Sequence, residues 1–301
     1  MSGQRSGAGR GLLYGVFAYA TWGLAPLYWQ LLKPASASEI LAHRVVWSLV
    51  FLVLLNQFRK SWPEITSVLR QPRLVKLLIA ASGFITLNWG LYIWSVVNDH
   101  VIDASLGYFI NPLINVVWGV FLFREKLRKM QWTAFAIAAA GVLFVTIDAG
   151  ALPWIGLTLG MTFSAYGAVK KIANVDAVES LTIETLLLIP FALGYLVFIE
   201  MNHSAAFLHA GALQAGWSMM AGVLTAVPLL AFGAAAVRIP YSTMGILQYM
   251  SPTIQFIIGF TILGETMTTG RWTGFAIVWV ALAIFSVDAI RHGRSFAQSD
   301  E

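Results

Sequence analysis

Long apolar stretches follow one another along the chain, and short polar segments separate them. An α-helix needs about 20 apolar residues to cross a bilayer. The pattern predicts ten such helices, whose connecting loops leave no room for a soluble domain. The predicted spans are Leu12–Leu32, Ser38–Phe58, Leu74–Val97, Ile102–Phe123, Met130–Ile147, Pro153–Val169, Leu181–Ile199, Leu213–Ala236, Tyr241–Leu263 and Trp272–Ile290. We therefore expect an all-α polytopic membrane protein.

The composition excludes a soluble globular protein. Of the 301 residues, 58% are hydrophobic and 11% are charged, against about 45–50% and 25% in soluble domains. So few charged residues cannot cover a surface that faces water. Because cysteine is absent, disulfide frameworks, iron–sulfur clusters and thiol catalysis are excluded as well.

The basic residues predict an orientation. If the N-terminus is cytoplasmic, every Lys and Arg except Lys33, Arg44 and Arg271 falls in a cytoplasmic loop or terminus. Membrane proteins carry this excess on the cytoplasmic side, so we expect both termini there. The net charge of +5 then reflects topology and indicates no nucleic-acid partner. The first apolar run continues past Ala20 to Leu32, which favours a span over a cleaved signal peptide.

An internal repeat divides the chain. The stretch from Pro112 to Asp148 matches the stretch from Pro252 to Asp288 without a gap, and the hydropathy of the five earlier spans follows that of the five later ones. We expect two five-helix halves, residues 1–150 and 151–301. Because five is odd, the second half enters the membrane from the opposite side, which is the architecture of alternating access. Duplication for stability alone is the alternative.

Polar residues gather on one face of the fourth predicted span. This stripe consists of Ser105, Tyr108, Asn111 and Asn115, and the repeat places Gly245, Gln248, Ser251 and Gln255 at the matching positions of the ninth span. Each stripe also carries a proline, Pro112 or Pro252, which frees a backbone carbonyl and permits bending. Two facing stripes favour the walls of a cavity, and interhelical hydrogen bonds that only join helices are the alternative.

Charged residues inside predicted spans are the next candidates, because a charge at a helix centre costs about 2.5–3.5 kcal/mol. Glu39, His43 and Arg44 lie near the outer end of the second span. Glu39 and His43 share a face and are expected to pair. Arg44 points away from them, so its expected partner is Asp103 at the outer entrance of the fourth span, or a substrate. In the alternative, Arg44 reaches the outer headgroups and His43 is a packing residue.

Glu184 in the seventh span occupies the position that the repeat relates to His43. It is expected about one turn inside the cytoplasmic surface, at a depth from which it reaches water. A carboxylate there is a candidate gate or proton site.

Aromatic residues lie at mid-span positions among polar ones. Trp22, Trp89 and Tyr92 stand near Asn88 and the polar stripe, where they can offer π surface to an organic solute. Helix packing is the alternative for each of them. Nucleotide-binding loops, metal-ligand spacing and catalytic motifs are absent from the sequence, so we expect no enzyme activity, cofactor or metal.

Several strings of residues resemble the RarD proteins of the drug/metabolite transporter superfamily, which consist of two EamA-type halves. They are Glu39–Trp47, Asn88–Trp89, Tyr92–Trp94, Ala104–Leu113 and Ile183–Thr185. The resemblance covers nearly the whole chain and implies a bacterial inner-membrane permease of ten helices, whose cavity is formed by the first four helices of each half. It implies no particular substrate. The Phe123–Glu125 segment departs from the ending that many relatives share, whereas Leu263–Glu265 keeps it.

We therefore expect a secondary transporter that moves a small amphipathic organic solute outward by alternating access. The expected solute-binding residues are Trp22, His43, Arg44, Asn88, Trp89, Tyr92, Tyr108, Asn111, Asn115, Gln248 and Gln255, and the expected gating or proton-coupling residues are Glu39, Asp103, Glu184, Pro112 and Pro252. The expected partners are the solute, the bilayer and a coupling proton, with the protein as a monomer or homodimer. An intramembrane enzyme with His43 as base, a passive channel and an interaction subunit are the alternatives.

Overall fold

The structure is a computed structural model that describes residues 2–124, 128–236, 238 and 247–298. These residues form helices and connecting loops, and no strand occurs among them. The helices are α1 (Ser2–Gln30), α2 (Ala37–Arg59), α3 (Trp62–Leu69), α4 (Pro72–Val97), α5 (Val101–Phe123), α6 (Lys129–Ala149), α7 (Trp154–Ala173), α8 (Ala177–Met201), α9 (Ala212–Ala236), α11 (Met250–Ile257), the π-helix η1 (Ile258–Ile262) and α12 (Thr269–Gln298). The prediction of an all-α protein is confirmed.

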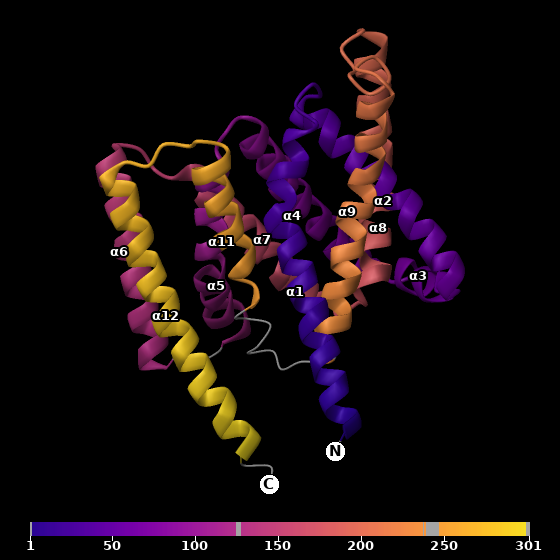
Figure 1. Cartoon of the computed structure of the whole chain (residues 1–301). Coiled ribbons are helices and arrows are strands. Elements are labelled where there is room, and N and C mark those ends of the chain that lie inside the picture. The colour runs from indigo at the N-terminus through magenta and orange to yellow at the C-terminus, as the bar shows by residue number, and fades with distance from the viewer. Residues whose placement is uncertain (1, 125–127, 237, 239–246, 299–301) are drawn as a thin grey trace.

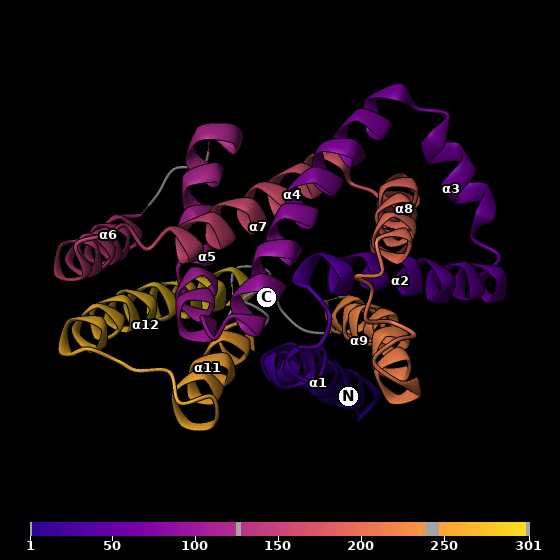
Figure 2. The same ribbon diagram turned by 90° about the horizontal axis from the view of Figure 1, so that it is seen from above.

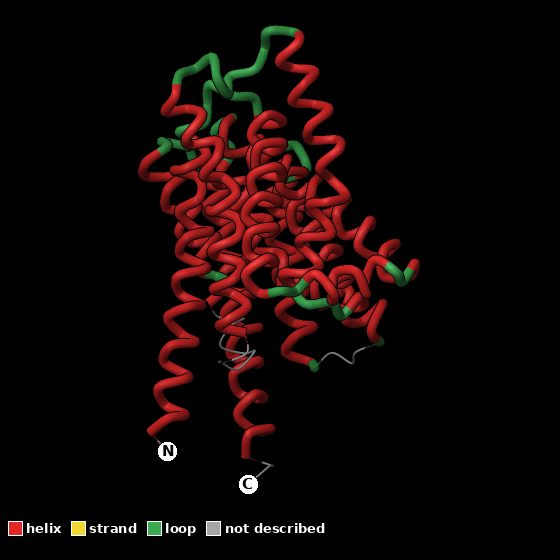
Figure 3. The backbone as a smooth tube through the Cα atoms, turned by 90° about the vertical axis from the view of Figure 1, so that its right-hand side faces the viewer, coloured by secondary structure: helices red, strands yellow, loops and turns green. Residues whose placement is uncertain are grey.

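Seven of these helices are long and apolar enough to cross a bilayer, so this is a multi-pass membrane protein. They are α2, α4, α5, α6, α8, α9 and α12. The helices α1 and α7 coincide with the first and sixth predicted spans, and α11 with η1 forms a shorter apolar helix in the ninth. The count of ten spans stays a prediction. The helices run side by side, and the N- and C-terminal ends of the chain lie at the same end of the bundle (Figures 1 and 3).

The ninth predicted span is not one uninterrupted helix. Its first residues, Gly245 among them, lie outside the described part of the chain. A turn at Gln248 and Tyr249 precedes α11, so Pro252 lies in the first turn of α11, where its missing N–H breaks no helical hydrogen bond. Pro112, by contrast, lies inside α5. The two prolines therefore have different local roles.

The short helix α3 was not predicted. Proline follows Trp62 at the start of α3, and its Ile65 side chain is buried against Leu78 of α4 and Ile183 of α8. Proline is well tolerated in a first helical turn, because the N–H it lacks would have no partner there. The two edges of the bundle are α3 on one side and the closely packed pair of α6 and α12 on the other (Figure 2).

Helices that are far apart in sequence form the centre of the bundle. The helix α1 packs against α9 and α11, α7 packs against α4 and α5, and α2 packs against α8 and α9. One apolar cluster includes Trp29, Ile93 and Leu159, which come from α1, α4 and α7. A second cluster joins Phe109 of α5 to aromatic residues of α11 and α12. The core is thus built mainly between the earlier and the later part of the chain.

Glycines allow two of these pairs to approach closely. A Cβ on Gly156 of α7 would lie 3.1 Å from the backbone nitrogen of Gly107 in α5. A Cβ on Gly222 of α9 would lie 2.6 Å from the backbone nitrogen of Ser48 in α2, and still closer to the carbonyl of Trp47. Small residues serve this purpose in membranes, because helix association there depends on van der Waals contact.

Gly222→Ala is expected to destabilise the protein by about 1–3 kcal/mol, because the added methyl group forces α9 away from α2. The measurement is the midpoint of thermal unfolding of purified protein in detergent. Gly216→Ala on the same helix is the matched control, since a Cβ there meets no atom within 4 Å. If both variants lowered the unfolding midpoint equally, the close approach of α9 to α2 at Gly222 would not explain the loss of stability.

Candidate functional site

Arg44 lies in the interior of the bundle. The first turn of α2 is capped by Ser36, whose hydroxyl accepts a hydrogen bond from the Glu39 N–H, and Arg44 follows in the next turns. Its side chain lies over two indole rings: the guanidinium carbon is 3.8 Å from the ring centroid of Trp89 and 5.3 Å from that of Trp29. Only 7% of the residue is exposed. The alternative in which Arg44 reaches the outer headgroups is therefore wrong.

The predicted pairing of Arg44 with Asp103 is also wrong. The Asp103 carboxylate lies 3.3 Å from Arg271 Nη2 and 3.3 Å from His100 Nδ1, at the start of α5. Among the described residues no carboxylate pairs with Arg44, and its buried Nε has no acceptor. Asp103 instead joins the starts of α5 and α12.

Two tyrosines and an asparagine complete the surroundings of Arg44. The phenol groups of Tyr92 and Tyr108 lie within electrostatic range of the guanidinium, and their rings are 5.6 Å apart. The Tyr108 hydroxyl donates to Asn88 Oδ1 at 3.2 Å. Asn88 in turn donates to the Leu159 carbonyl and the Thr162 hydroxyl of α7. The structure therefore brings together five of the residues named as candidates from the sequence: Arg44, Asn88, Trp89, Tyr92 and Tyr108.

The polar stripes make contacts between helices. Asn111 donates to the Gly160 carbonyl of α7 at 3.3 Å, and Asn115 donates to Asn111 Oδ1 at 3.0 Å. Gln255 of α11 donates to the Trp22 carbonyl of α1 at 3.2 Å. In this conformation the stripes thus join helices, which is the alternative considered for them. Gln248 lies in the turn before α11, and the Trp22 ring packs against Tyr19 and Phe232.

Glu39 holds the loop that connects α8 to α9. Its Oε1 atom accepts hydrogen bonds from the backbone N–H groups of Ala206 at 2.8 Å and Phe207 at 2.9 Å. The expected partner His43 lies 4.0 Å from the same atom, which is beyond hydrogen-bond distance. The His43 ring stacks on Phe207 instead, with ring centroids 4.3 Å apart. His43 therefore takes part in holding this loop and lies apart from the Arg44 cluster.

A second carboxylate, which the site prediction missed, acts in a similar way. Glu265 Oε1 accepts from the Val101 N–H and Oε2 from the Ile102 N–H, at the N-terminus of α5. Burial raises the pKa of this carboxyl, and the two backbone hydrogen bonds oppose that shift. The sequence feature that could have indicated Glu265 is its position directly after Gly264, at the end of the ninth predicted span. Phe207 had no such signal, because a loop aromatic is unremarkable in sequence.

Glu184 is more deeply buried than predicted. Only 1% of it is exposed, so the expectation that it reaches water is wrong. Its carboxylate lies 2.7 Å from Lys170 Nζ and accepts a hydrogen bond from the Tyr166 hydroxyl. Glu184 is also the eighth residue of α8, as Arg44 is of α2, so the two side chains lie at the same distance from the start of their helices.

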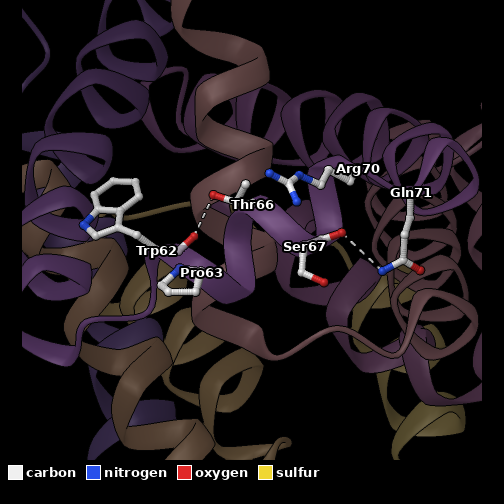
Figure 4. Close-up of a pocket in the computed structure, with 6 residues that line it drawn as sticks. All are labelled: Trp62, Pro63, Thr66, Ser67, Arg70 and Gln71. Atoms are coloured by element: carbon white, nitrogen blue, oxygen red, sulfur yellow. Dashed lines mark hydrogen bonds between the residues drawn. The ribbon is translucent and has the colours of Figure 1, made fainter.

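A surface groove lies at some distance from the Arg44 cluster. A groove of about 680 Å³ beside α3 is lined by Trp62, Pro63, Thr66, Ser67, Arg70 and Gln71 (Figure 4). Arg44 lies 15 residues before the last residue of α2, which is about 22 Å along the helix. The groove is therefore separate from the Arg44 cluster.

Comparison with known proteins identifies the class of protein to which this chain belongs. The EamA-like transporter family matches residues 9–147. A solved crystal structure shares the fold with a TM-score of 0.59, at 17% identity over 93% of this chain and 98% of its own. Together with the buried charges in apolar helices, these matches define a membrane transporter.

Relatives that align over nearly the full length of this chain identify the family of transporters. Protein RarD of Streptomyces exfoliatus is 47% identical over 94% of this chain and 90% of its own. An uncharacterized transporter of Pseudomonas aeruginosa is 43% identical over 96% and 97%, and protein RarD of Escherichia coli is 41% identical over 93% and 95%. The chain belongs to the RarD-type permeases of the EamA family. This is a family of transporters and not of enzymes.

The two carboxylates that hold backbone N–H groups should respond differently to the same substitution. Glu39 uses one oxygen for both N–H groups, so Glu39→Gln keeps the acceptor and costs little. Glu265 uses one oxygen for each, so Glu265→Gln turns an amide NH₂ toward an N–H group and costs about 1–3 kcal/mol.

Hydrogen exchange by mass spectrometry checks this prediction at residues 204–209 and 99–104. Only the second segment should lose protection in its variant, and Glu39→Ala should release the first. Loss of protection to the same extent in both glutamine variants would contradict the geometry.

Proposed function

We propose that this protein is a secondary transporter that carries a small amphipathic organic solute outward across the bacterial inner membrane by alternating access. One observation carries the proposal: helices pair reciprocally between the two parts of the chain. The first helix of each part packs against the fourth helix of the other, α1 against α11 and α7 against α5.

This pairing supports two inverted five-helix halves, residues 1–150 and 151–301. Hydrogen bonds reinforce each pair, from Asn111 to the Gly160 carbonyl and from Gln255 to the Trp22 carbonyl. Each of these hydrogen bonds joins one half to the other. When one half rocks against the other, such a bond can break and a different one can form in its place. Inverted repeats that rock around a central site alternate its access between the two sides.

The outer side is closed in the described conformation. Glu39 binds the α8–α9 loop, Glu265 binds the start of α5, and Asp103 pairs with Arg271. Each of these links joins one proposed half to the other. We propose that they form the outer gate, with His43 stacked beneath it on Phe207, and that they separate when the site opens outward.

The solute site in this proposal surrounds Arg44. Trp89, Tyr92, Tyr108 and Asn88 form its wall on α4 and α5. The polar stripe residues Asn111, Gln248 and Gln255, with Trp22, become available when the halves part, whereas Asn115 is already exposed. The prolines at positions 112 and 252 assist that movement. Glu184, paired with Lys170, is the proton-coupling group on the inner side.

Counterflow into proteoliposomes tests this function, with a solute identified by metabolite release from cells with and without the protein. Glu184→Gln should keep counterflow at the wild-type rate and lose the response to a proton gradient, because an amide cannot exchange a proton with Lys170. Glu200→Gln, an exposed site on the same helix, should keep both. Flux without counterflow exchange would indicate a channel, and loss of counterflow in Glu184→Gln would assign Glu184 to another role.

The proposed orientation has its own test, and the absence of native cysteine makes it direct. Lys33→Cys should react with a membrane-impermeant maleimide in cells with a permeabilised outer membrane, because it follows α1 on the proposed outer side. Arg70→Cys, after α3, should react only when the inner membrane is opened. The reverse pattern would place both termini outside.

A further inference from the structure

We infer that Arg44 binds the carboxylate of the transported solute, so that the solute is a small organic monoanion with an aromatic or apolar body. This inference rests on the proposed transport function and names the chemical class of its substrate. It starts from a property that sets Arg44 apart from the other buried charges. Arg44 has no countercharge among the described residues.

Other buried ionic groups have protein partners. Glu39 receives two backbone N–H groups, Glu184 pairs with Lys170, and Asp288 pairs with Arg128 at its surface end. Arg44 is the one Lys or Arg among the described residues that is buried. An unpaired charge in a membrane helix is expensive and marks a functional site. The missing partner of Arg44 is therefore expected to come from outside the protein.

The contacts around Arg44 leave its hydrogen-bonding edge free. The Trp89 ring lies over the guanidinium at 3.8 Å, and a cation–π contact of this kind satisfies the charge through the face of the group. The five N–H donors of arginine point outward in the plane, where their fork fits a carboxylate. The buried Nε has no acceptor among the described residues. The face of the Arg44 guanidinium is thus covered by Trp89, while its Nε–H remains free to bind a ligand.

Nearby donors point to the same ligand. The Trp29 Nε1–H and the Tyr92 hydroxyl are buried and have no hydrogen-bond partner among the described residues. Both belong to the apolar cluster next to Arg44, and Trp29 lies 5.3 Å from it. Each of these groups offers an N–H or O–H to an oxyanion, as the Arg44 Nε does. Two unsatisfied donors beside a cation that itself has no acceptor at Nε favour an anion over a neutral or cationic solute.

The charge balance favours a carboxylate over a phosphate. A single guanidinium neutralises a monoanion, whereas a phosphate dianion would leave a net negative charge in the membrane interior. The wall is formed by the Trp89 and Trp29 indoles and the Tyr92 and Tyr108 rings, which suit an aromatic or apolar body next to the carboxylate.

The test compares carboxylates with their uncharged amides on the purified full-length protein at neutral pH. The probes are phenylacetate and phenylacetamide, indole-3-propionate and its amide, and hexanoate and hexanamide, each at millimolar concentration. Binding to the folded state raises the unfolding temperature. We expect at least one carboxylate to raise it while its amide does not.

Arg44→Gln should weaken binding of that carboxylate at least about tenfold, which corresponds to about 1.4 kcal/mol. Arg44→Lys keeps the charge without the planar fork and should recover only part of the affinity. Lys33→Gln is the matched control, because it removes one positive charge from an exposed outer pair with Asp99 and should bind like the wild type. If Arg44→Gln does not fold, Arg44→Lys still separates a binding role from a purely structural one.

Three results would overturn the inference: amides that bind as well as carboxylates, a charge preference that survives in Arg44→Gln, or no carboxylate that raises the unfolding temperature. A counterflow measurement distinguishes failure of this inference from failure of the proposed transport function. If the wild-type protein showed counterflow of a neutral solute but bound no carboxylate, the transport function would be supported. The assignment of Arg44 as an anion site would then be wrong. Absence of counterflow with every released metabolite would count against the transport function itself.

Discussion

Within the hydrocarbon core no water is available to solvate a polar atom, so a buried polar group there is stabilised by a partner within the fold or by a ligand. This constraint explains where the helices meet. Asn88 reaches α7, Gln255 reaches α1, and Glu39 reaches the loop before α9. In each case the partner is a backbone group or hydroxyl of a helix or loop distant in sequence. The polar contacts therefore tie together the parts of the bundle that are most separated along the chain.

The same constraint gives Arg44 and Glu184 their different roles. Each is the eighth residue of its helix, yet Glu184 has a cation and a phenol beside it, while Arg44 has aromatic rings and no charged partner among the described residues. A paired charge is stable without a ligand. An unpaired one depends on polarisable surroundings and on whatever enters them. The two positions therefore differ in their electrostatic surroundings: Glu184 is neutralised by Lys170, and Arg44 lies against aromatic rings.

Much of the fold follows from the sequence, since apolar length decides where a helix can cross a membrane. The second predicted span, Ser38–Phe58, differs from α2 by one residue at each end, and the fourth differs from α5 by one residue at its start. The ninth was harder, because a turn at Gln248 and Tyr249 interrupts a continuous apolar stretch. Hydropathy measures transfer into lipid and carries no information about local backbone bends.

The sequence by itself determined the class of protein, the helical segments and the polar residues worth attention, because these depend on composition and on periodicity along one helix. Only the tertiary structure decided which of those residues are partners. It assigned Asp103 to Arg271, His43 to Phe207 and Lys170 to Glu184, and it left Arg44 between two indole rings. Depth in the membrane can be estimated from sequence, but the side of a helix that a neighbour covers depends on how all the helices pack.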